Sequence, residues 1–248
     1  MSAMCRPAAR FVLLLALLLS PVLASATPCG APDDLIEPVP LPATAAAVAN
    51  RVLPVLVVGS ASVAGPGGSG ADSAYPAQLE ALLARSFPGT RVEVVAQGGR
   101  GMLAADHLAL IRTALGQRRR ALVLWQAGTV EAVRGADIGE MTAALQQGAE
   151  RVREAGGDLI LLDPQWSRFL RANADVEAYR DALRAAAAAT GAGLFSRYEL
   201  MGAWAEAGTV DVERAPRELK VVEVDKLNRC LAQSLAEMVA QGVAEARR

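Results

Sequence analysis

Five short, nearly continuous apolar runs follow residue 50 and are the clearest regular feature of the chain. Each run is apolar at adjacent positions, so both faces of each predicted strand are expected to be buried. Stretches with apolar residues at helical spacing separate the runs. This alternation predicts an α/β fold, a three-layer α/β/α sandwich around a five-stranded parallel sheet. The predicted strands are Val55–Val58, Val92–Val95, Ala121–Trp125, Leu159–Leu162 and Gly193–Phe195.

The stretches between these runs predict at least five helices. They are marked by Leu79–Leu83, Leu103–Leu115, Met141–Val152 and Val176–Ala189, and by a last helix that begins around Asp225. In open parallel sheets, ligands bind outside the carboxyl ends of the strands, near the point where the strand order reverses. Residues that directly follow the predicted strands are therefore the first candidates for a functional site.

The first 26 residues have the order of a secretory signal peptide. Arg6 and Arg10 precede an apolar run from Phe11 to Leu19, and the small residues Ala24-Ser25-Ala26 follow that run. The run is too short to span a bilayer comfortably, because a spanning helix needs about 20 apolar residues. The sequence therefore predicts an exported protein, periplasmic or secreted, with no membrane span.

The remaining chain divides into two parts. Residues 27–50 are rich in proline and alanine and lack strong periodicity, which predicts an extended leader lying over the domain. Residues 51–248 show no internal repeat and no linker, so they are predicted to form one domain.

Composition and charge exclude several classes of function. The 248 residues are 52% hydrophobic and 21% charged, as expected of a folded domain rather than a disordered tail. The formal net charge is −1 and the basic residues are scattered, so no nucleic-acid partner is predicted. The chain has one histidine and three cysteines, which excludes most metal sites, and neither a metal nor a cofactor is predicted.

Two cysteines remain after removal of the signal peptide. Cys29 lies near the new terminus and Cys230 near the end of the chain, and export would place both where a disulfide persists. Alternatively, Cys230 fills the core as a free thiol, because it lies at helical spacing from Leu227 and Leu231. The sequence leaves both readings open, since it does not show whether the two Cα atoms approach within about 7 Å.

The turn after the first predicted strand is rich in glycine and serine. It reads Gly59-Ser60-Ala61-Ser62-Val63-Ala64-Gly65 and is followed by Pro66-Gly67-Gly68-Ser69-Gly70. A glycine-rich turn can cradle a phosphate, but no lysine lies near this one and its glycine spacing fits neither a P-loop nor a dinucleotide-binding motif. Phosphate binding is therefore disfavoured.

The same turn, from Val58 to Gly65, resembles the first block of the GDSL, or SGNH, hydrolase family, which in many bacterial members reads Gly-Ser-Ser-Ser-Thr-Ala-Gly. Further segments similar to that family follow in family order over about residues 53–240. The resemblance implies the flavodoxin-like SGNH hydrolase fold for almost the whole mature domain. These segments are Ala74–Leu83, Phe87–Gly89, Gln97–Gly101, Trp125–Thr129, Asp163–Trp166 and Arg229–Ala232.

The resemblance implies acyl-ester hydrolysis as the family chemistry. A serine on the first turn attacks, a histidine near the last helix removes its proton, and a glycine and an asparagine hold the oxyanion. Here the nucleophile, oxyanion-glycine, oxyanion-asparagine and histidine positions hold, in that order, Ala61, Gly101, Val130 and Val222. A gap in the alignment would instead place Lys220 or Asn228 at the histidine position. Only the glycine matches the family pattern.

Other residues offer a weaker route to catalysis. Ser60 or Ser62 would be a displaced nucleophile if Glu131 or Asp225 supplied a base. The structural alternative is that Ser60 satisfies backbone groups of the turn and that Ser62 caps a helix, and we favour it. His107 is predicted on the packed face of the second helix, satisfied and partly buried, several turns from the strand ends.

Several polar residues near the strand ends are candidates for binding a small polar, acyl or glycan ligand. They are Ser60, Ser62, Gly101, Gln126, Thr129 and Gln165, joined by Arg100, Glu131 and Trp166. Amides and an aromatic face suit a sugar or another polar neutral ligand. It is equally consistent with the sequence that the amides only tie down neighbouring loops.

Three hypotheses for function follow. We favour a non-catalytic, exported SGNH-like protein that keeps the family's crevice as a binding or scaffold surface, because three catalytic positions are substituted together. The second is a remodelled esterase or acyl hydrolase that uses Ser60 or Ser62. The third is a structural partner of a cell-envelope assembly.

Overall fold

A five-stranded parallel sheet forms the centre of the molecule, as predicted. The computed structural model describes residues 29–30, 32 and 35–248, and the strand order is β2-β1-β3-β4-β5. This is the flavodoxin-like order, whose direction of winding reverses between β1 and β3. Each predicted strand forms, with its bounds extended or shifted by at most three residues. The strands are β1 (Val52–Gly59), β2 (Arg91–Gly98), β3 (Leu122–Gln126), β4 (Asp158–Leu162) and β5 (Gly193–Phe195).

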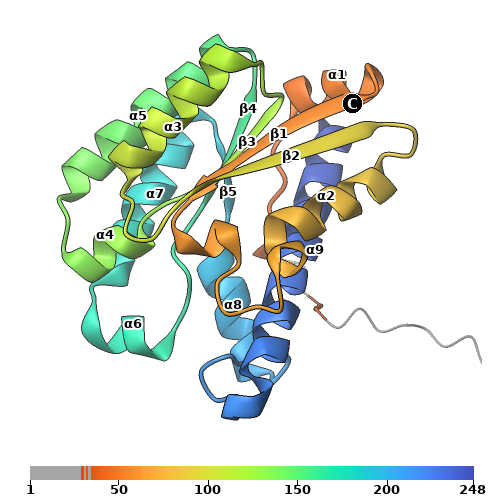
Figure 1. Ribbon diagram of the computed structural model, residues 1–248. Helices are drawn as coiled ribbons and strands as arrows, with labels where there is room; N and C mark the ends of the chain where they lie inside the picture. The colour runs from red at the N-terminus through yellow and green to blue at the C-terminus, as the bar shows by residue number, and fades with distance from the viewer. Residues whose placement is uncertain (1–28, 31, 33–34) are drawn as a thin grey trace, which may run out of the picture.

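Helices cover both faces of this sheet, which completes the three predicted layers (Figure 1). The last helix begins at Lys220, about a turn before the predicted start. The α-helices, in chain order, are α1 (Pro42–Ala49), α2 (Tyr75–Ser86), α3 (Ala104–Gln117), α4 (Thr129–Arg134), α5 (Ile138–Glu154), α6 (Arg168–Asn173), α7 (Val176–Thr190), α8 (Arg197–Glu206) and α9 (Lys220–Glu245), with 3-10 turns η2 (Ala61–Ala64), η3 (Ala71–Ser73) and η4 (Arg217–Leu219).

The alternation of side chains along the inner strands divides the core into two halves. In β1, Val55 and Val57 pack toward α2 and α9, whereas Leu56 and Val58 pack toward α3 and α5. All four side chains are fully buried. Such a strand must be apolar at every position, which is why the sequence shows continuous runs rather than alternation.

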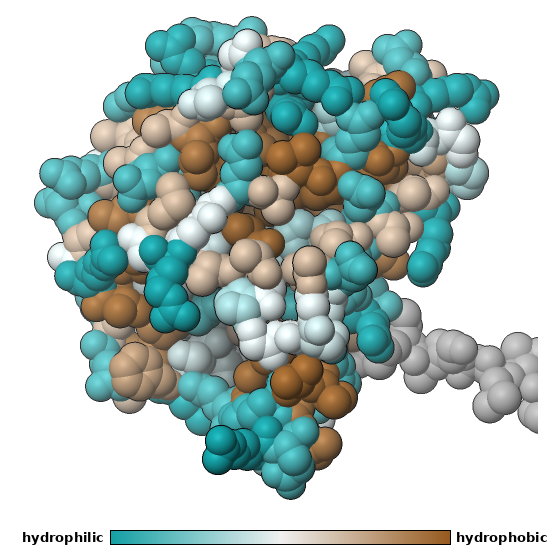
Figure 2. Space-filling view, viewed as in Figure 1, coloured by the Kyte–Doolittle hydropathy of each residue, from teal (hydrophilic) through white to brown (hydrophobic). Residues whose placement is uncertain are grey.

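Strand β2 differs from the prediction because it lies at the edge of the sheet. It is half-buried or exposed along its length, and Val95 is 37% exposed. Figure 2 shows hydrophobic surface in the region of β1 and β2, bordered by hydrophilic side chains. Glu80 of α2 reaches this edge and accepts a hydrogen bond from the backbone N–H of Val94 at 2.7 Å. A carboxylate on an outer N–H blocks further strand pairing there.

The segment predicted as an extended leader is partly helical and packs onto the domain. Helix α1 begins with Pro42 at its first turn and continues through alanines, both of which favour helix formation. Thr44 is fully buried, and its backbone N–H and its hydroxyl both donate to Asp158 Oδ2 at 2.7 Å. Leu41 is also buried. The domain therefore begins before residue 51.

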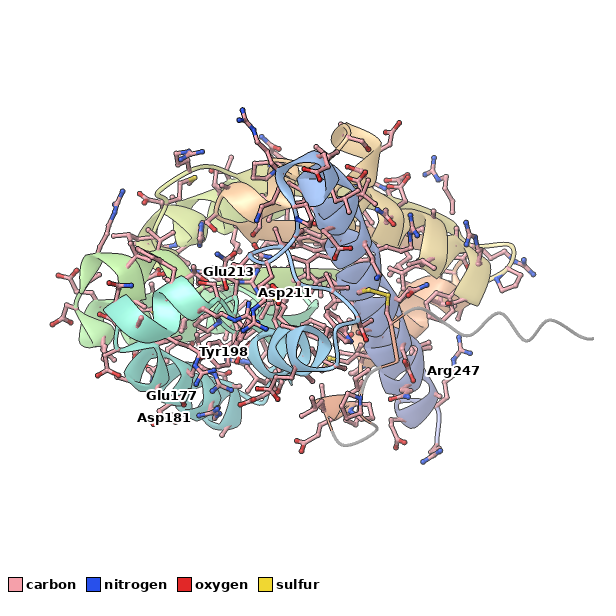
Figure 3. All side chains as sticks on the ribbon, turned by 90° about the horizontal axis from the view of Figure 1, so that it is seen from below. Glu177, Asp181, Tyr198, Asp211, Glu213 and Arg247 are labelled. Carbon is pink, nitrogen blue, oxygen red and sulfur yellow. A yellow bond between two sulfur atoms is a disulfide. The ribbon has the colours of Figure 1, made fainter. Side chains whose placement is uncertain are left out.

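A disulfide joins Cys29 to Cys230 of α9, with the Cα atoms 5.1 Å apart. It is the yellow bond beside α9 in Figure 3. Because Cys230 is bridged, the alternative of a free core thiol is wrong. Both cysteines are buried, and Cys230 does lie in the core. The bridge closes a sequence separation of 201 residues.

The predicted signal peptide lies outside the described residues. Within the part of the chain that the structure describes, no helix combines the length and the apolar character that crossing a membrane requires.

We expect replacement of Cys29 by alanine to lower the free energy of unfolding by about 2–4 kcal/mol, because the bridge restricts the unfolded chain. The melting temperature should fall by about 5–15 °C. Calorimetry with and without reductant measures both. A reductant should bring the wild type to the melting temperature of Cys29→Ala and leave that variant unchanged; equal melting of wild type and variant without reductant would contradict the prediction.

Candidate functional site

The turn after β1 is held very close to its neighbours by glycine. A Cβ on Gly98 would lie 1.7 Å from the carbonyl oxygen of Gly59, and one on Gly59 would lie 2.4 Å from Gln126 Oε1. A side chain fits at neither position. The carboxyl ends of β1, β2 and β3 therefore meet at one point, beside the reversal in strand order where such sheets bind ligands.

The two serines of this turn have different roles from those predicted. Ser60 precedes η2 but makes no side-chain capping bond. Ser62 lies within η2, and its hydroxyl donates to Gln126 Oε1 at 2.9 Å, so it does not cap a helix. Gln126 thus ties the turn after β1 to the end of β3, as the structural alternative for this amide required.

A small pocket, too closely walled to admit a water molecule, lies at this point. Four of the predicted ligand-binding candidates line it: Ser60, Gln126, Thr129 and Glu131. Neither Gly101 nor Gln165 is among its lining residues, and Ser62 contributes only through its bond to Gln126. The full lining is Ser60, Met102, His107, Gln126, Ala127, Thr129, Val130, Glu131 and Arg197.

His107 lies at the strand ends, contrary to the prediction that it would be several turns away. Helix α3 begins at Ala104, so His107 falls in its first turn. The side chain is 1% exposed, which agrees with the predicted packing. Its Nδ1 atom accepts a hydrogen bond from Trp125 Nε1 at 3.2 Å, so the proton of the neutral ring is on Nε2.

The environment of His107 strongly favours the neutral ring. Burial lowers its pKa from 6.5 to about 4, and the smaller effects of Asp106 and of the Gly59 backbone raise it. Nε2 makes no hydrogen bond of normal geometry to the residues that the structure describes. With Nδ1 occupied and Nε2 protonated, the imidazole has no free position to accept a proton from a serine.

The two carboxylates proposed as alternative bases are also engaged. Glu131 is 2% exposed, and its oxygens accept backbone N–H groups of Ala104 at 2.7 Å and Gly128 at 2.9 Å. Asp225 accepts the backbone N–H of Ser69 at 2.9 Å. Hydrogen bonds from Ser69 hold the pKa of Asp225 below its ordinary value, which makes it a weaker base.

The positions aligned with the family's catalytic residues are spread over the crevice and beyond it. Ala61 begins η2 and Val130 lines the pocket. Gly101 has a φ of 78°, and a Cβ there would lie 2.6 Å from the Arg134 guanidinium, so a cation lies against the oxyanion glycine. Val222 of α9 is 58% exposed.

The two positions that a gapped alignment offers for the histidine are filled by other polar groups. Asn228 is 6% exposed, and its Nδ2 atom has no hydrogen-bond partner among the described residues. Lys220 donates through Nζ to the carbonyl oxygens of Val212 and Glu213.

Arg197 is a pocket residue that the sequence analysis missed. It is 3% exposed, and it donates through Nε to the backbone oxygen of Asp163 at 3.1 Å and through Nη2 to Thr129 Oγ1 at 3.2 Å. Burial lowers the pKa of its guanidinium below the ordinary value. Arg197 follows β5 by two residues, so the rule that ligands bind at the carboxyl ends of the strands applies to it as well.

An ion cluster beside the pocket joins the end of β4 to α7 and α8, with Arg180 and Asp163 buried and the carboxylates of Glu177 and Glu199 exposed. Arg180 is 3% exposed and donates to Asp163 Oδ2 at 3.1 Å, to Glu199 at 2.5 Å and to Glu177. Its guanidinium also stacks 4.2 Å from the ring centre of Tyr198. A cleft of about 610 Å³ opens beside these groups, between α6, α7 and α8. Figure 3 labels Glu177 and Tyr198 on its walls.

Among residues 29–30, 32 and 35–248, no group of three or more histidine, cysteine or acidic side chains is arranged to hold a metal ion.

Comparison with known proteins identifies the family. Residues 28–245 match the model of the Non-GDSL lipase-like family. The chain belongs to this family. The membership agrees with the resemblance to SGNH hydrolases and with a first turn that does not read Gly-Asp-Ser. None of the curated protein sequences compared with the chain matches it.

Solved structures that include an acetylxylan esterase and a protein of the G-D-S-L family have the same fold as this family member, which confirms the predicted fold class. TesA is 23% identical, with a TM-score of 0.57 over 74% of this chain and 98% of its own. A catalytic mutant of Axe2, an acetylxylan esterase from Geobacillus stearothermophilus, is 16% identical, with a TM-score of 0.60 over 75% and 94%. A putative G-D-S-L lipolytic protein from Desulfitobacterium hafniense is 14% identical, with a TM-score of 0.56 over 76% and 99%.

We expect His107 to remain neutral, with its proton on Nε2, from pH 8 down to about pH 5, since its pKa is lowered to about 4. The chain has a single histidine, so imidazole nitrogen shifts in an NMR titration report on this residue alone. Titration near 6.5, or a proton on Nδ1, would contradict the assignment.

The same lowered pKa has a consequence for stability. Between pH 6.5 and about 4 the unfolded chain binds a proton at His107 that the folded chain does not, so stability falls as pH falls through this window. The loss is about 1.4 kcal/mol per pH unit. His107→Gln keeps an acceptor for Trp125 and should lack this contribution, which denaturant unfolding at several pH values measures.

We expect Arg180→Met to lower the free energy of unfolding by about 3–5 kcal/mol, because Asp163 would be left as a buried charge without its partner. Arg184→Met is the matched control. Arg184 lies one turn later on α7, is 42% exposed and pairs with exposed Asp181, so its loss should cost less than about 1 kcal/mol. Denaturant unfolding of the oxidised proteins compares them, and equal losses would contradict the prediction.

Proposed function

We propose that this protein is an exported, non-catalytic member of the Non-GDSL lipase-like family that uses its strand-end crevice to bind a ligand. The observation that carries the proposal is the lack of a usable proton acceptor near Ser60 among the described residues. His107, Glu131 and Asp225 are the candidate bases. His107 accepts at Nδ1 and is protonated at Nε2, both oxygens of Glu131 accept backbone N–H groups, and Asp225 Oδ1 accepts the backbone N–H of Ser69. A serine hydroxyl without a base is a poor nucleophile.

The groups that would attack and stabilise charge support the same proposal. Ala61 offers no hydroxyl, and the hydroxyl hydrogen of Ser62 is donated to Gln126. Val130 offers no donor where the family's oxyanion asparagine would lie. Catalytic groups of this kind act as a unit, so the loss of several together removes far more than partial activity.

The ligand we propose is small and polar or carries an acyl group. The pocket is narrow, and its lining combines polar donors with Met102, Ala127 and Val130. A structural neighbour is named an acetylxylan esterase, which is consistent with an acyl or glycan ligand. A protein partner in the cell envelope stays part of the proposal, because a binding protein can also act as a scaffold.

Export is supported by two independent features. The N-terminal sequence has the charge and apolar pattern of a signal peptide. The Cys29–Cys230 disulfide is of a kind that persists in the periplasm or outside the cell and is rare in the cytosol.

We expect the purified mature protein to hydrolyse short-chain p-nitrophenyl esters no faster than a heat-treated sample. Ala61→Ser alone should not create activity, because the new hydroxyl would still lack a base. Absorbance at the p-nitrophenolate band measures both, with a working SGNH esterase assayed beside them.

The remodelled-hydrolase hypothesis makes the opposite prediction. A serine-directed fluorophosphonate would then label the wild type, and Ser60→Ala combined with Ser62→Ala would abolish the labelling. Ester turnover together with such serine-dependent labelling would overturn the proposed non-catalytic function. Turnover by Ala61→Ser alone would reveal a base in the crevice and would also count against it.

A further inference from the structure

The strand-end pocket contains a buried positive charge that no carboxylate neutralises directly. Arg197 and Arg180 are equally buried, at 3% exposure. Arg180 is paired with three carboxylates, whereas the hydrogen bonds of Arg197 go to a backbone carbonyl and a hydroxyl. Among the described residues, no carboxylate forms an ion pair with Arg197, and the charge of Asp163 acts on it only through space. A buried cation is costly unless an anion or strong acceptor compensates it.

A second group in the same pocket is an unused donor. Gln126 is 3% exposed, and its Oε1 atom accepts from Ser62, which leaves the Nε2 amide as the free end. Nε2 is buried and has no hydrogen-bond partner among the described residues. An unpartnered buried donor costs about 1–3 kcal/mol, so an acceptor placed beside it is stabilising.

The acidic residue of the pocket does not meet either need. Glu131 directs one oxygen to the N–H of Ala104 and the other to that of Gly128. The remaining polar lining comprises Ser60, Thr129 and the neutral His107. The pocket is therefore rich in donors, and its one cation has no ion-pair partner among the residues that line it.

We propose that this pocket binds a small carboxylate, with Arg197 and Gln126 Nε2 as the donors to its two oxygens. The proposal rests on the non-catalytic function and names the chemistry of its ligand. A forked guanidinium matches a carboxylate better than a single carbonyl. One positive charge beside Glu131 suits a monoanion rather than a dianion such as sulfate. Met102, Ala127 and Val130 give the lining apolar groups that a short aliphatic chain can contact.

The pocket is closed in this structure, with no space in it large enough to hold a water molecule. Its walls lie so close together that a side chain must move when a ligand enters. Met102 is the half-buried, flexible and unbranched side chain of the lining, and we assign this movement to it. Met102→Ala is then expected to bind carboxylates at least as well as the wild type.

The test uses the mature, oxidised protein and isothermal titration at constant ionic strength with acetate, propionate, acetamide and sulfate. Acetate or propionate should bind at least tenfold more tightly than acetamide, which has the same shape without the charge, and more tightly than sulfate. Equal binding of acetate and acetamide, or stronger binding of sulfate, would overturn the proposal, as would the absence of any binding.

Two isosteric variants locate the site. Gln126→Glu keeps an oxygen for the Ser62 hydroxyl but replaces the free donor with a negative charge, so acetate affinity should fall at least tenfold. Gln165→Glu makes the same change at a residue outside the pocket lining and should leave acetate affinity within twofold of the wild type. Equal effects of the two variants would overturn the assignment. If Gln126→Glu does not fold, Gln126→Met removes the donor without adding charge and should show the same loss.

The two proposals fail in distinguishable ways. Ester turnover would overturn the non-catalytic function, and the ratio of acetate to acetamide affinity would still decide the carboxylate site. Without that selectivity, the carboxylate site is wrong and the non-catalytic function stands.

Discussion

The geometry of the whole crevice depends on the contact between the carboxyl ends of β1 and β2. Gly59 and Gly98 approach so closely that a Cβ on Gly98 would overlap the backbone of Gly59. This approach leaves Gln126 against the turn and allows Ser62 to donate to it. It also brings the first turn of α3, with His107, to the same place. Two glycines thus set the positions of groups that come from three strands and a helix.

Much of the fold was predictable because burial on both faces leaves a clear mark on the sequence. Strands such as β1 and β3 are apolar at adjacent positions, and the amphipathic helices α5 and α7 show one apolar stripe. Helix α8 lacks such a stripe, since residues on several of its faces are buried. The sequence predicts an extended leader at α1, because the alanines of this helix give no contrast between an apolar and a polar face. The sequence leaves the pairing of Cys29 with Cys230 undecided, because the separation of two residues along the chain does not determine their distance in space.

The site was predicted in part, for a similar reason. Residues directly after long strands, such as Ser60 and Gln126, were found by the rule that places ligands at strand ends. The sequence pattern predicts His107 too far from the strand ends, because it does not define the start of α3 closely. Arg197 is not predicted, because β5 has only three residues and gives a weak strand signal. The state of each group depends on its partners. The hydrogen bond from Trp125 to His107 joins a strand to a helix, and no local pattern in the sequence predicts it.

The Cys29–Cys230 bridge turns most of this domain into a covalent ring. All five strands lie between the two bridged cysteines, and the second half of α9 follows the second one. A mechanical force applied to the two ends of the chain is therefore carried by the sulfur–sulfur bond and does not reach the sheet. Such a force can unfold the part of α9 that follows Cys230, but it cannot separate the strands until the disulfide is broken.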